Sequence, residues 1–193
     1  MPTAEKRPRA DAVRNFERLL ETAREQFETR GAEMAFEDVA RVAGLGKGTL
    51  YRHFPTRDHL LAALLASTFE DLAVEADRLL ATRAPLEAYV EWLGAFDRMP
   101  APYRGLRAVL MESLGDDASA IAIACEPLKR SFAAIVAGAQ RDGLVHVHID
   151  SDELMTVVAA LPDHLRGTEP QHPWLDVVID GSLTDAGRQA RRT

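Results

Sequence analysis

Basic and hydrogen-bonding side chains gather in one short window of the chain. The window contains Lys47, Thr49, Tyr51, Arg52, His53 and Arg57. Such side chains donate hydrogen bonds to phosphate oxygens and to the edges of base pairs exposed in the DNA grooves. No Asp or Glu occurs from residue 39 to residue 57, so the window is locally basic. These residue types predict contact with DNA.

Two short helices joined by a tight glycine turn must position these side chains. We expect helices over residues 36–43 and 47–53, with Gly44-Leu45-Gly46 between them. Gly44 permits a positive φ at the end of the first helix, and the small Gly46 lets the backbone approach a phosphate. Leu50 and Phe54 would face the core. This arrangement is typical of a helix-turn-helix.

The glycine-rich turn has two other interpretations. A phosphate-binding nucleotide loop needs four residues between its first glycine and the Gly-Lys-Ser/Thr, and it follows a buried strand, so the spacing here argues against it. The glycines could also simply shape a corner in a structural bundle. Upstream, Lys6, Arg7 and Arg9 form a basic arm within residues 1–10, which is either a minor-groove contact or a flexible tail.

Longer amphipathic helices flank this motif. Apolar residues recur at helical spacing from residue 11 to residue 30, and Gly31 suits the left-handed end of that helix. Thr56 can cap a long fourth helix that ends near residues 81–84. Further helices are expected over 86–98, 103–114, 118–141, 151–161 and 174–185. The chain is thus predicted to be all-α, with about nine helices and an extended connector at 145–150.

Length and charge divide the chain into two predicted domains. Of its 193 residues, 47% are hydrophobic, and the net charge of −7 argues at first against nucleic acid. However, residues 1–57 hold 11 Lys and Arg against 9 Asp and Glu, whereas residues 58–193 hold 12 against 21. We therefore expect a DNA-binding domain at 1–57 and an acidic ligand-binding and dimerisation domain at 58–193.

Composition also bears on the compartment. Cys125 is the single cysteine, so the chain cannot form an internal disulfide, and a reducing cytoplasm is expected. No apolar run approaches the roughly 20 residues of a membrane-spanning helix, and the N-terminus lacks the apolar core of a signal peptide. We predict no membrane partner and no export.

Residues 14–65 resemble the DNA-binding domain of the TetR/AcrR family of transcriptional regulators, above all in the run Asp38-Val39-Ala40-Arg41-Val42-Ala43-Gly44-Leu45-Gly46-Lys47-Gly48-Thr49-Leu50-Tyr51-Arg52-His53-Phe54-Pro55. The resemblance implies a homodimeric repressor that binds a pseudo-palindromic operator and is released by a small-molecule effector. It places family DNA-contact positions at Lys47, Gly48, Thr49, Tyr51, Arg52, His53 and Arg57. Two departures put phosphate contacts in doubt, because Ala35 and Gly46 stand where members commonly have Ser or Thr.

The C-terminal part offers candidate pocket and dimer residues. Large apolar side chains line most small-molecule sites, although packing in the core is their commoner role. The candidate pocket walls are Trp92, Phe96, Met99, Tyr103, Leu110, Met111 and Phe132. Pro127 should kink its helix or limit where it starts. By the resemblance, the last two helices would form the dimer interface, with apolar faces at Leu154, Val157, Val158 and Leu161, and at Trp174, Val177, Val178 and Leu183; a core role for some of these is equally open.

Metal binding and catalysis find little support in the sequence. His146 and His148 form an H-x-H pair near Asp150, but no third nitrogen or sulfur ligand lies at a recognisable spacing. No GxSxG, HExxH or paired-carboxylate pattern occurs in a plausible setting. We therefore expect no metal, no cofactor and no enzyme activity. The remaining alternative is a helical small-molecule-binding protein or enzyme whose N-terminal helices no longer bind DNA.

Overall fold

The computed structural model describes residues 6–31, 34–99, 118–162 and 173–192, and this part of the chain is almost entirely helical. The first four helices are α1 (Lys6–Arg30), α2 (Phe36–Val42), α3 (Lys47–His53) and α4 (Arg57–Thr82). They are followed by α5 (Pro85–Arg98), α7 (Ala120–Arg141), α8 (Ser151–Ala159), α9 (Leu175–Ser182) and α10 (Asp185–Arg191). The all-α prediction is confirmed. The predicted helix over 103–114 lies outside the described residues.

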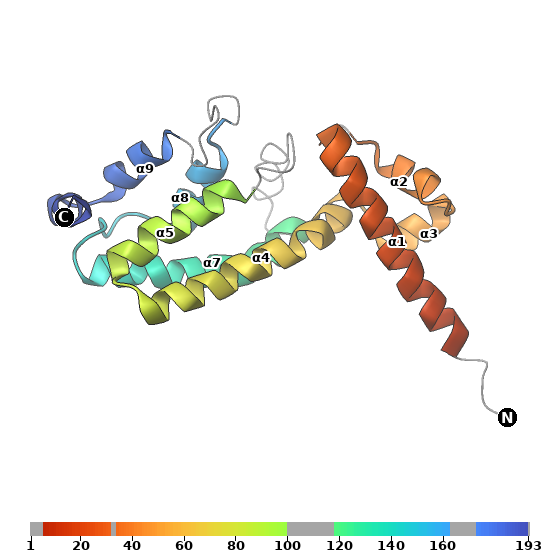
Figure 1. The fold of residues 1–193 in the computed structure, drawn as a ribbon, viewed down its shortest axis with the longest axis horizontal. Coiled ribbons are helices and arrows are strands. Elements are labelled where there is room, and N and C mark those ends of the chain that lie inside the picture. Colours follow the sequence, from red (N-terminus) through yellow and green to blue (C-terminus); the bar gives the residue numbers. More distant parts are fainter. Residues whose placement is uncertain (1–5, 32–33, 100–117, 163–172, 193) are drawn as a thin grey trace.

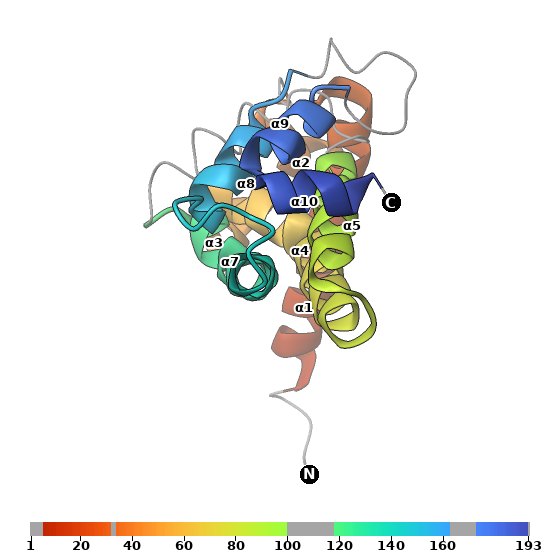
Figure 2. The same ribbon diagram turned by 90° about the vertical axis from the view of Figure 1, so that its left-hand side faces the viewer.

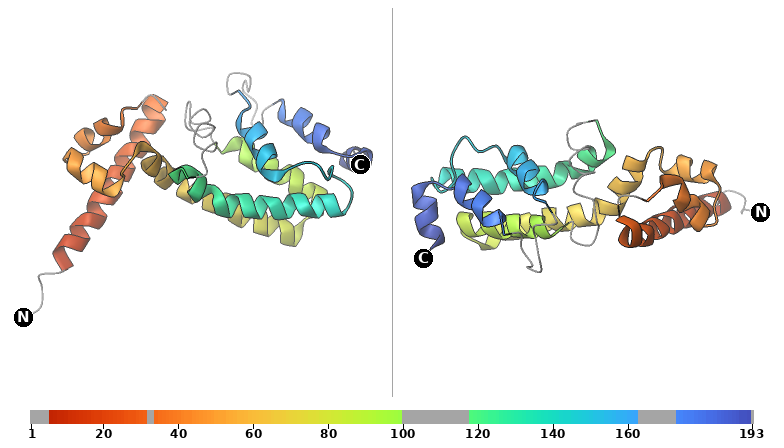
Figure 3. Two further views of the ribbon diagram at one scale, coloured as in Figure 1. Left: turned by 180° about the vertical axis from the view of Figure 1, so that it is seen from behind. Right: turned by 90° about the horizontal axis from the view of Figure 1, so that it is seen from above.

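The helices form an elongated molecule in which α1, α2 and α3, here called the N-terminal unit, lie at one end (Figure 1). Helix α4 begins in this unit, where it packs on α1, and continues into the bundle (Figure 3). Its longest interface is with α7, and α5 packs against both of them. Figure 2 shows the molecule along the bundle. There α8 packs against α7 and α5, and α9 and α10 pack against α5. None of the described helices is long and apolar enough to cross a membrane.

The first helix starts earlier than the sequence suggested. It begins at Lys6, not at Asp11, so residues 6–10 are helical. Pro8 lies in the first turn, where a backbone N–H has no helical partner in any case, so proline is tolerated there. At the other end Gly31 has φ +64°, which confirms the expected left-handed termination.

A continuous apolar core holds the N-terminal unit together. Its members are fully or almost fully buried, and they come from α1, α2, α3 and the start of α4: Leu19, Ala23, Phe27, Val39, Ala40, Leu50, Phe54, Leu60 and Leu61. Leu50 and Phe54 face this core as predicted. Thr56 caps α4 by accepting a hydrogen bond from the backbone N–H of His59 at 3.4 Å. These contacts hold α3 in a fixed orientation, with its outer face, the side opposite the core, exposed to solvent.

The bundle core contains stacked aromatic rings. Trp92 of α5 stacks on Phe132 of α7 with ring centroids 4.1 Å apart, and its indole N–H donates to the Leu72 carbonyl at 3.1 Å. Tyr89 lies 2.6 Å from the Ser182 hydroxyl, which itself donates to a backbone carbonyl, so the tyrosine is the donor. Burial raises the pKa of Tyr89 to about 12. These contacts join α4, α5, α7 and α9.

Pro127 neither ends nor starts a helix. Helix α7 runs from Ala120 to Arg141 with Pro127 inside it, and the Ser119 hydroxyl caps its first turn. The proline therefore does not limit the start of this helix, and of the two expected effects the kink stays a prediction. The proline lies in the second turn of a helix long enough to continue beyond it, and its ring is exposed.

The predicted helix over 174–185 is two helices. Leu183 is extended (φ −82°, ψ 143°), fully buried and paired with Val145 in an isolated antiparallel bridge. Thr184 then caps α10 and also donates to the Gly143 carbonyl at 2.7 Å. The predicted connector at 145–150 is not extended throughout, because it turns at Val147 and His148, where the N–H of Ile149 donates to the His146 carbonyl at 3.1 Å. The Gln140 amide holds this turn by donating to the carbonyls of His146 and Ile149. Val145 and Leu183 are 38 residues apart in the sequence, and their pairing interrupts a stretch whose local pattern is helical.

Gly187 brings α10 against this connector, and replacing it with alanine should destabilise the fold. A Cβ there would lie 3.0 Å from the Leu144 carbonyl carbon and closer still to its oxygen. Backbone atoms cannot rotate away, so α10 must shift and strain the Thr184 contacts. We expect G187A to lower the free energy of unfolding, measured in urea, by about 1–3 kcal/mol.

Gly181 provides the matched control for this prediction. It is exposed in α9, and a Cβ would meet no atom within 4 Å. Because alanine favours a helix over glycine, G181A should stabilise the protein by roughly 0.5–1 kcal/mol. A G187A protein as stable as the wild type would show that α10 does not need this close approach.

Candidate nucleic-acid interface

The turn between α2 and α3 has the geometry that the sequence indicated. Gly44 has φ +65°, and the N–H of Leu45 donates to the Ala40 carbonyl at 2.9 Å. A Cβ at Gly44 would also lie 3.2 Å from the Arg18 guanidinium of α1. Glycine is therefore favoured here by the positive φ, because the Arg18 guanidinium ends a flexible side chain that can move aside.

Helix α3 and the start of α4 carry all seven predicted DNA-contact residues. Lys47, Gly48, Tyr51 and Arg52 are exposed, and the Lys47 side chain retains 66% of its surface. Thr49, His53 and Arg57 are half-buried. The structure thus brings the seven onto one short segment but gives them unequal access to a ligand.

His53 differs from its neighbours because it also packs against α1. Its ring meets Phe16 edge to face, with centroids 6.0 Å apart, and Phe16 in turn contacts Phe54 at 5.1 Å. The histidine therefore helps to join α1 to α3, whichever groups its ring nitrogens contact. Arg57 is the first residue of α4 and lies beyond the end of α3.

The two departures noted in the sequence remain visible as uncapped helix starts. Ala35 precedes α2 and Gly46 precedes α3, and neither provides a side-chain hydrogen bond to the first turn. Gly46 has an ordinary φ of −72°, so the backbone does not require glycine there. A hydroxyl that could cap the helix or meet a phosphate is absent at both positions.

Glu37 is a functional candidate that the sequence reasoning missed. Its carboxylate, at the start of α2, accepts hydrogen bonds from the Lys47 ammonium and from the Tyr51 hydroxyl, the latter at 3.0 Å. Lys47 and Tyr51 thereby hold the pKa of Glu37 below its ordinary value. The same bonds raise the pKa values of Lys47 and Tyr51, and both groups stay protonated at neutral pH. Glu37 is 10 residues from Lys47 and 14 residues from Tyr51 in the sequence, with a turn between them, so the local sequence pattern could not predict this cluster.

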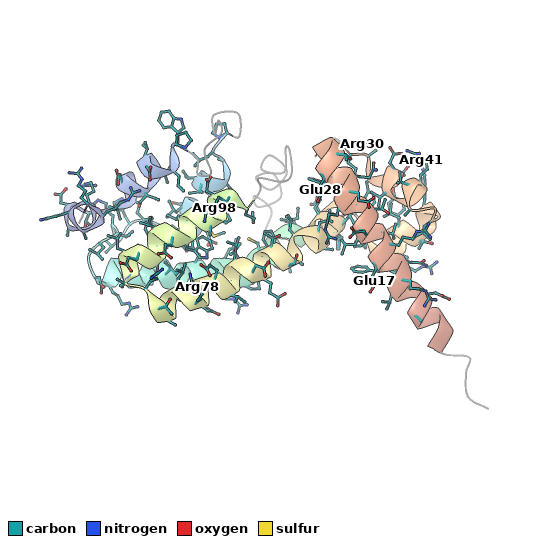
Figure 4. All side chains as sticks on the ribbon, in the orientation of Figure 1. Glu17, Glu28, Arg30, Arg41, Arg78 and Arg98 are labelled. Atoms are coloured by element: carbon teal, nitrogen blue, oxygen red, sulfur yellow. The ribbon has the colours of Figure 1, made fainter. Side chains whose placement is uncertain are left out.

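A second carboxylate neutralises another cation of the basic window. Asp38 accepts from Arg41 at 3.1 Å and lies 3.6 Å from Arg30 at the end of α1. Figure 4 shows Arg30 and Arg41 along the upper side of the N-terminal unit. By contrast, Arg52 has no hydrogen bond or ion pair with any part of the chain that the structure describes. Its guanidinium is the most available cation on α3.

The candidate pocket residues fall into two groups. Trp92 and Phe132 are fully buried and Phe96 nearly so, and their rings stack on one another within the bundle. Met99 is half-buried at the end of α5. The other three candidates, Tyr103, Leu110 and Met111, lie outside the described residues.

The predicted apolar faces of the last helices are divided between core and surface. Leu154, Val158 and Leu183 are buried, and Leu161 and Val178 are half-buried. Three large side chains stay exposed to solvent: Val157 (49%), Trp174 (51%) and Val177 (58%). Val157 lies in α8, Val177 lies in α9 and Trp174 directly precedes α9. The two helices lie near each other in Figures 1 and 2, and both pack on α5.

No metal centre emerges from the described residues, because no group of three or more His, Cys, Asp or Glu side chains gathers there. The His146 and His148 rings stack with centroids 5.1 Å apart. Cys125 is buried in α7, and burial raises the pKa of its thiol to about 11. The thiol is therefore protonated at neutral pH and is a poor nucleophile.

Two family models match this chain. Residues 19–64 match the model for bacterial regulatory proteins of the tetR family, and residues 84–182 match the model described as "Transcriptional regulator SbtR-like, C-terminal domain". The first match contains α2 and α3 with the turn between them, and the second covers about half of the chain.

Two curated relatives from Staphylococcus aureus match over shorter stretches. The HTH-type transcriptional regulator SAR0097 of strain MRSA252 is 30% identical over 84 residues, which make up 42% of this chain and 44% of that protein. The HTH-type transcriptional regulator SAB2452 of strain bovine RF122 / ET3-1 is 40% identical over 53 residues, or 27% and 29% of the two chains. The chain thus spans less than half the length of each relative.

Solved structures match over most of the chain. The TetR transcriptional regulator SCO0520 from Streptomyces coelicolor is 25% identical, with a TM-score of 0.55 over 88% of this chain and 99% of that one. Two others show the fold alone. Thermus thermophilus FadR, a repressor in complex with lauroyl-CoA, is 23% identical (TM-score 0.57, 76% and 78% covered), and RolR in complex with resorcinol is 20% identical (TM-score 0.59, 95% and 94% covered).

Proposed function

This chain belongs to the TetR family of DNA-binding transcriptional regulators, and we propose that it acts as a homodimeric repressor whose operator binding is released by a small-molecule effector. The observation that carries the proposal is the outer face of α3. Lys47, Tyr51 and Arg52 are exposed there, on a helix fixed from behind by Leu50 and Phe54. A rigid helix with exposed hydrogen-bond donors fits the major groove.

In this proposal residues 1–57 form the DNA-binding domain and residues 58–193 form the ligand-binding and dimerisation domain. The N-terminal part binds double-stranded DNA through Lys47, Gly48, Thr49, Tyr51, Arg52, His53 and Arg57. Two copies of α3 in a two-fold dimer would reach half-sites about one DNA turn, roughly 34–36 Å, apart, or somewhat more if the dimer is relaxed. The chain acts in the cytoplasm by binding and not by catalysis.

The exposed apolar residues of α8 and α9 support the dimer. Val157, Trp174 and Val177 expose about half of their surface on neighbouring helices. The free energy falls when a partner covers apolar side chains and removes them from water. Pairing this face with its symmetry mate would form a four-helix interface that covers all three side chains.

The proposed effector is a small apolar or amphipathic molecule bound within the C-terminal bundle. Apolar and aromatic walls are typical of small-molecule sites, and Trp92, Phe96, Met99 and Phe132 would provide them, together with Tyr103, Leu110 and Met111. Lauroyl-CoA and resorcinol, bound to FadR and RolR, show the kinds of molecule that this fold holds elsewhere. The effector would favour a dimer geometry in which the two α3 helices no longer match the operator.

Selection of genomic DNA fragments by the purified full chain tests the proposal. We expect enrichment of fragments that share a pseudo-palindrome and affinity that falls steeply with salt. For about six to ten phosphate contacts the loss should be roughly a thousandfold or more between 50 and 200 mM salt. If no fragment binds even at low salt, the chain is instead a helical small-molecule-binding protein or enzyme, and the repressor proposal fails.

A further inference from the structure

The contact between Glu37 and two DNA-facing residues is unusual for a surface that meets phosphate. Glu37, Lys47 and Tyr51 are all exposed, and the Glu37 side chain keeps 46% of its surface. The carboxylate accepts from the Lys47 ammonium and from the Tyr51 hydroxyl. A phosphate oxygen would take the same two hydrogen bonds. In the free protein, Glu37 therefore occupies the donors that DNA must recruit.

This cluster does little to hold the fold together. Exposed ion pairs contribute little to stability because water screens them. The α2–α3 interface is held by buried Val39, Ala40 and Leu50, and by Phe36, whose ring meets Tyr51 edge to face at 5.5 Å. Removal of the Glu37 charge should leave the helices in place. The role of the Glu37 carboxylate is therefore to be sought in DNA binding and not in stability.

We propose that Glu37 is a specificity-determining residue that keeps Lys47 and Tyr51 from phosphates and directs them to base edges. The inference rests on the proposed DNA-binding role of α3. In this role Glu37 helps the protein to discriminate between operator and non-operator DNA, which general attachment to the duplex does not do.

The physical basis is the difference between a base edge and a phosphate. Lys47 has three N–H donors, and the acceptors on a base edge carry no net charge, so Lys47 can bond a base and Glu37 together. The single O–H of Tyr51 is donated to Glu37, so its oxygen can only accept a hydrogen bond, which a base amino group offers and a phosphate does not. A phosphate carries a full negative charge that repels Glu37. Binding of Lys47 to phosphate therefore disrupts the pair and leaves the carboxylate beside the DNA backbone. Non-operator DNA, which is held by phosphate contacts, suffers this penalty more than the operator does.

The E37Q variant tests the proposal because glutamine keeps an oxygen acceptor of similar reach and removes the charge. The probe for non-operator DNA is a labelled 30-bp duplex of scrambled sequence, and the operator probe is the duplex most enriched in the genomic selection. For E37Q we expect the affinity for the scrambled duplex to rise about fivefold per bound N-terminal unit. Its slope of log affinity against log salt should steepen by about one per unit. The operator affinity should rise less, so that the ratio of the two affinities falls.

Glu70 provides a matched control, because it is exposed on α4 and E70Q makes the same change in net charge away from α3. E70Q should leave both affinities and the salt slope near the wild-type values. An equal rise in both affinities for E37Q, no change, or weaker binding to either duplex would overturn the proposal. Wild-type protein that selects no operator would overturn the DNA-binding role itself, and the two failures are thereby distinguished.

Discussion

Replacing Lys47 and Tyr51 together with alanine should weaken operator binding by about a hundredfold or more. Both side chains lie on the outer face of α3, and each contact to a base is worth at least about tenfold in affinity, so the two contacts together are worth at least about a hundredfold for each bound N-terminal unit. Gel-shift titration of K47A/Y51A against the wild type measures the loss. Unchanged affinity would remove α3 from the interface.

Two controls separate this loss from other effects. R130A removes an exposed positive charge on α7, far from α3, and should bind DNA as the wild type does. In K47A/Y51A, Glu37 also loses both of its partners and adds repulsion. The triple variant K47A/Y51A/E37Q should therefore regain a part of the affinity, and the remaining loss measures the missing contacts. Thermal unfolding should be close to that of the wild type for every variant.

Charging the exposed apolar face of α8 and α9 should give the other large effect. In V157E/V177E two glutamates replace valines that are 49% and 58% exposed, and a charge cannot be covered by an apolar partner without a large desolvation cost. We expect the variant to be a monomer by sedimentation. A single N-terminal unit loses the gain from simultaneous binding of two half-sites, so operator affinity should fall by about 10²- to 10⁴-fold.

Val74 offers the matched control for this prediction. It is 62% exposed on α4, so V74E makes the same kind of substitution away from α8 and α9. V74E should stay dimeric and bind the operator normally. If V157E/V177E also stays dimeric, the subunits meet through another surface.

Local sequence rules predicted the N-terminal unit well because its structure is set by short-range chemistry. Gly44 and Gly31 have the positive φ values expected of them, and Thr56 caps α4. The bounds of α2 and α3 follow from the glycine turn and from the proline after Phe54. The face of α3 that carries the candidate contacts could therefore be identified from residue order alone.

Long-range contacts explain where the sequence was insufficient. The break between α9 and α10 depends on Leu183 pairing with Val145, and the close approach at Gly187 depends on the same connector. Glu37 joins the candidate site only because the turn folds α2 back against α3. Helical periodicity reports which residues share a face of one helix, and it contains no information about such partners.

The charge distribution explains how an acidic chain can bind DNA. Residues 1–57 carry a small positive excess, and residues 58–193 carry all of the net negative charge. Just before the basic window, Asp38 pairs with Arg41 and Glu37 pairs with Lys47, so two of the window's cations are partly neutralised. General attraction to DNA should be modest, which increases the weight of base contacts in operator choice.

Chemical protection of the operator by dimethyl sulfate tests most directly that α3 binds in the major groove. The reagent methylates guanine N7, which faces the major groove, and adenine N3, which faces the minor groove. We predict that the bound wild-type protein protects guanine N7 in two blocks about one helical turn, roughly 10 bp, or somewhat more apart, and that K47A/Y51A loses this protection. Bound DNA whose guanine N7 atoms all stay reactive would contradict the account.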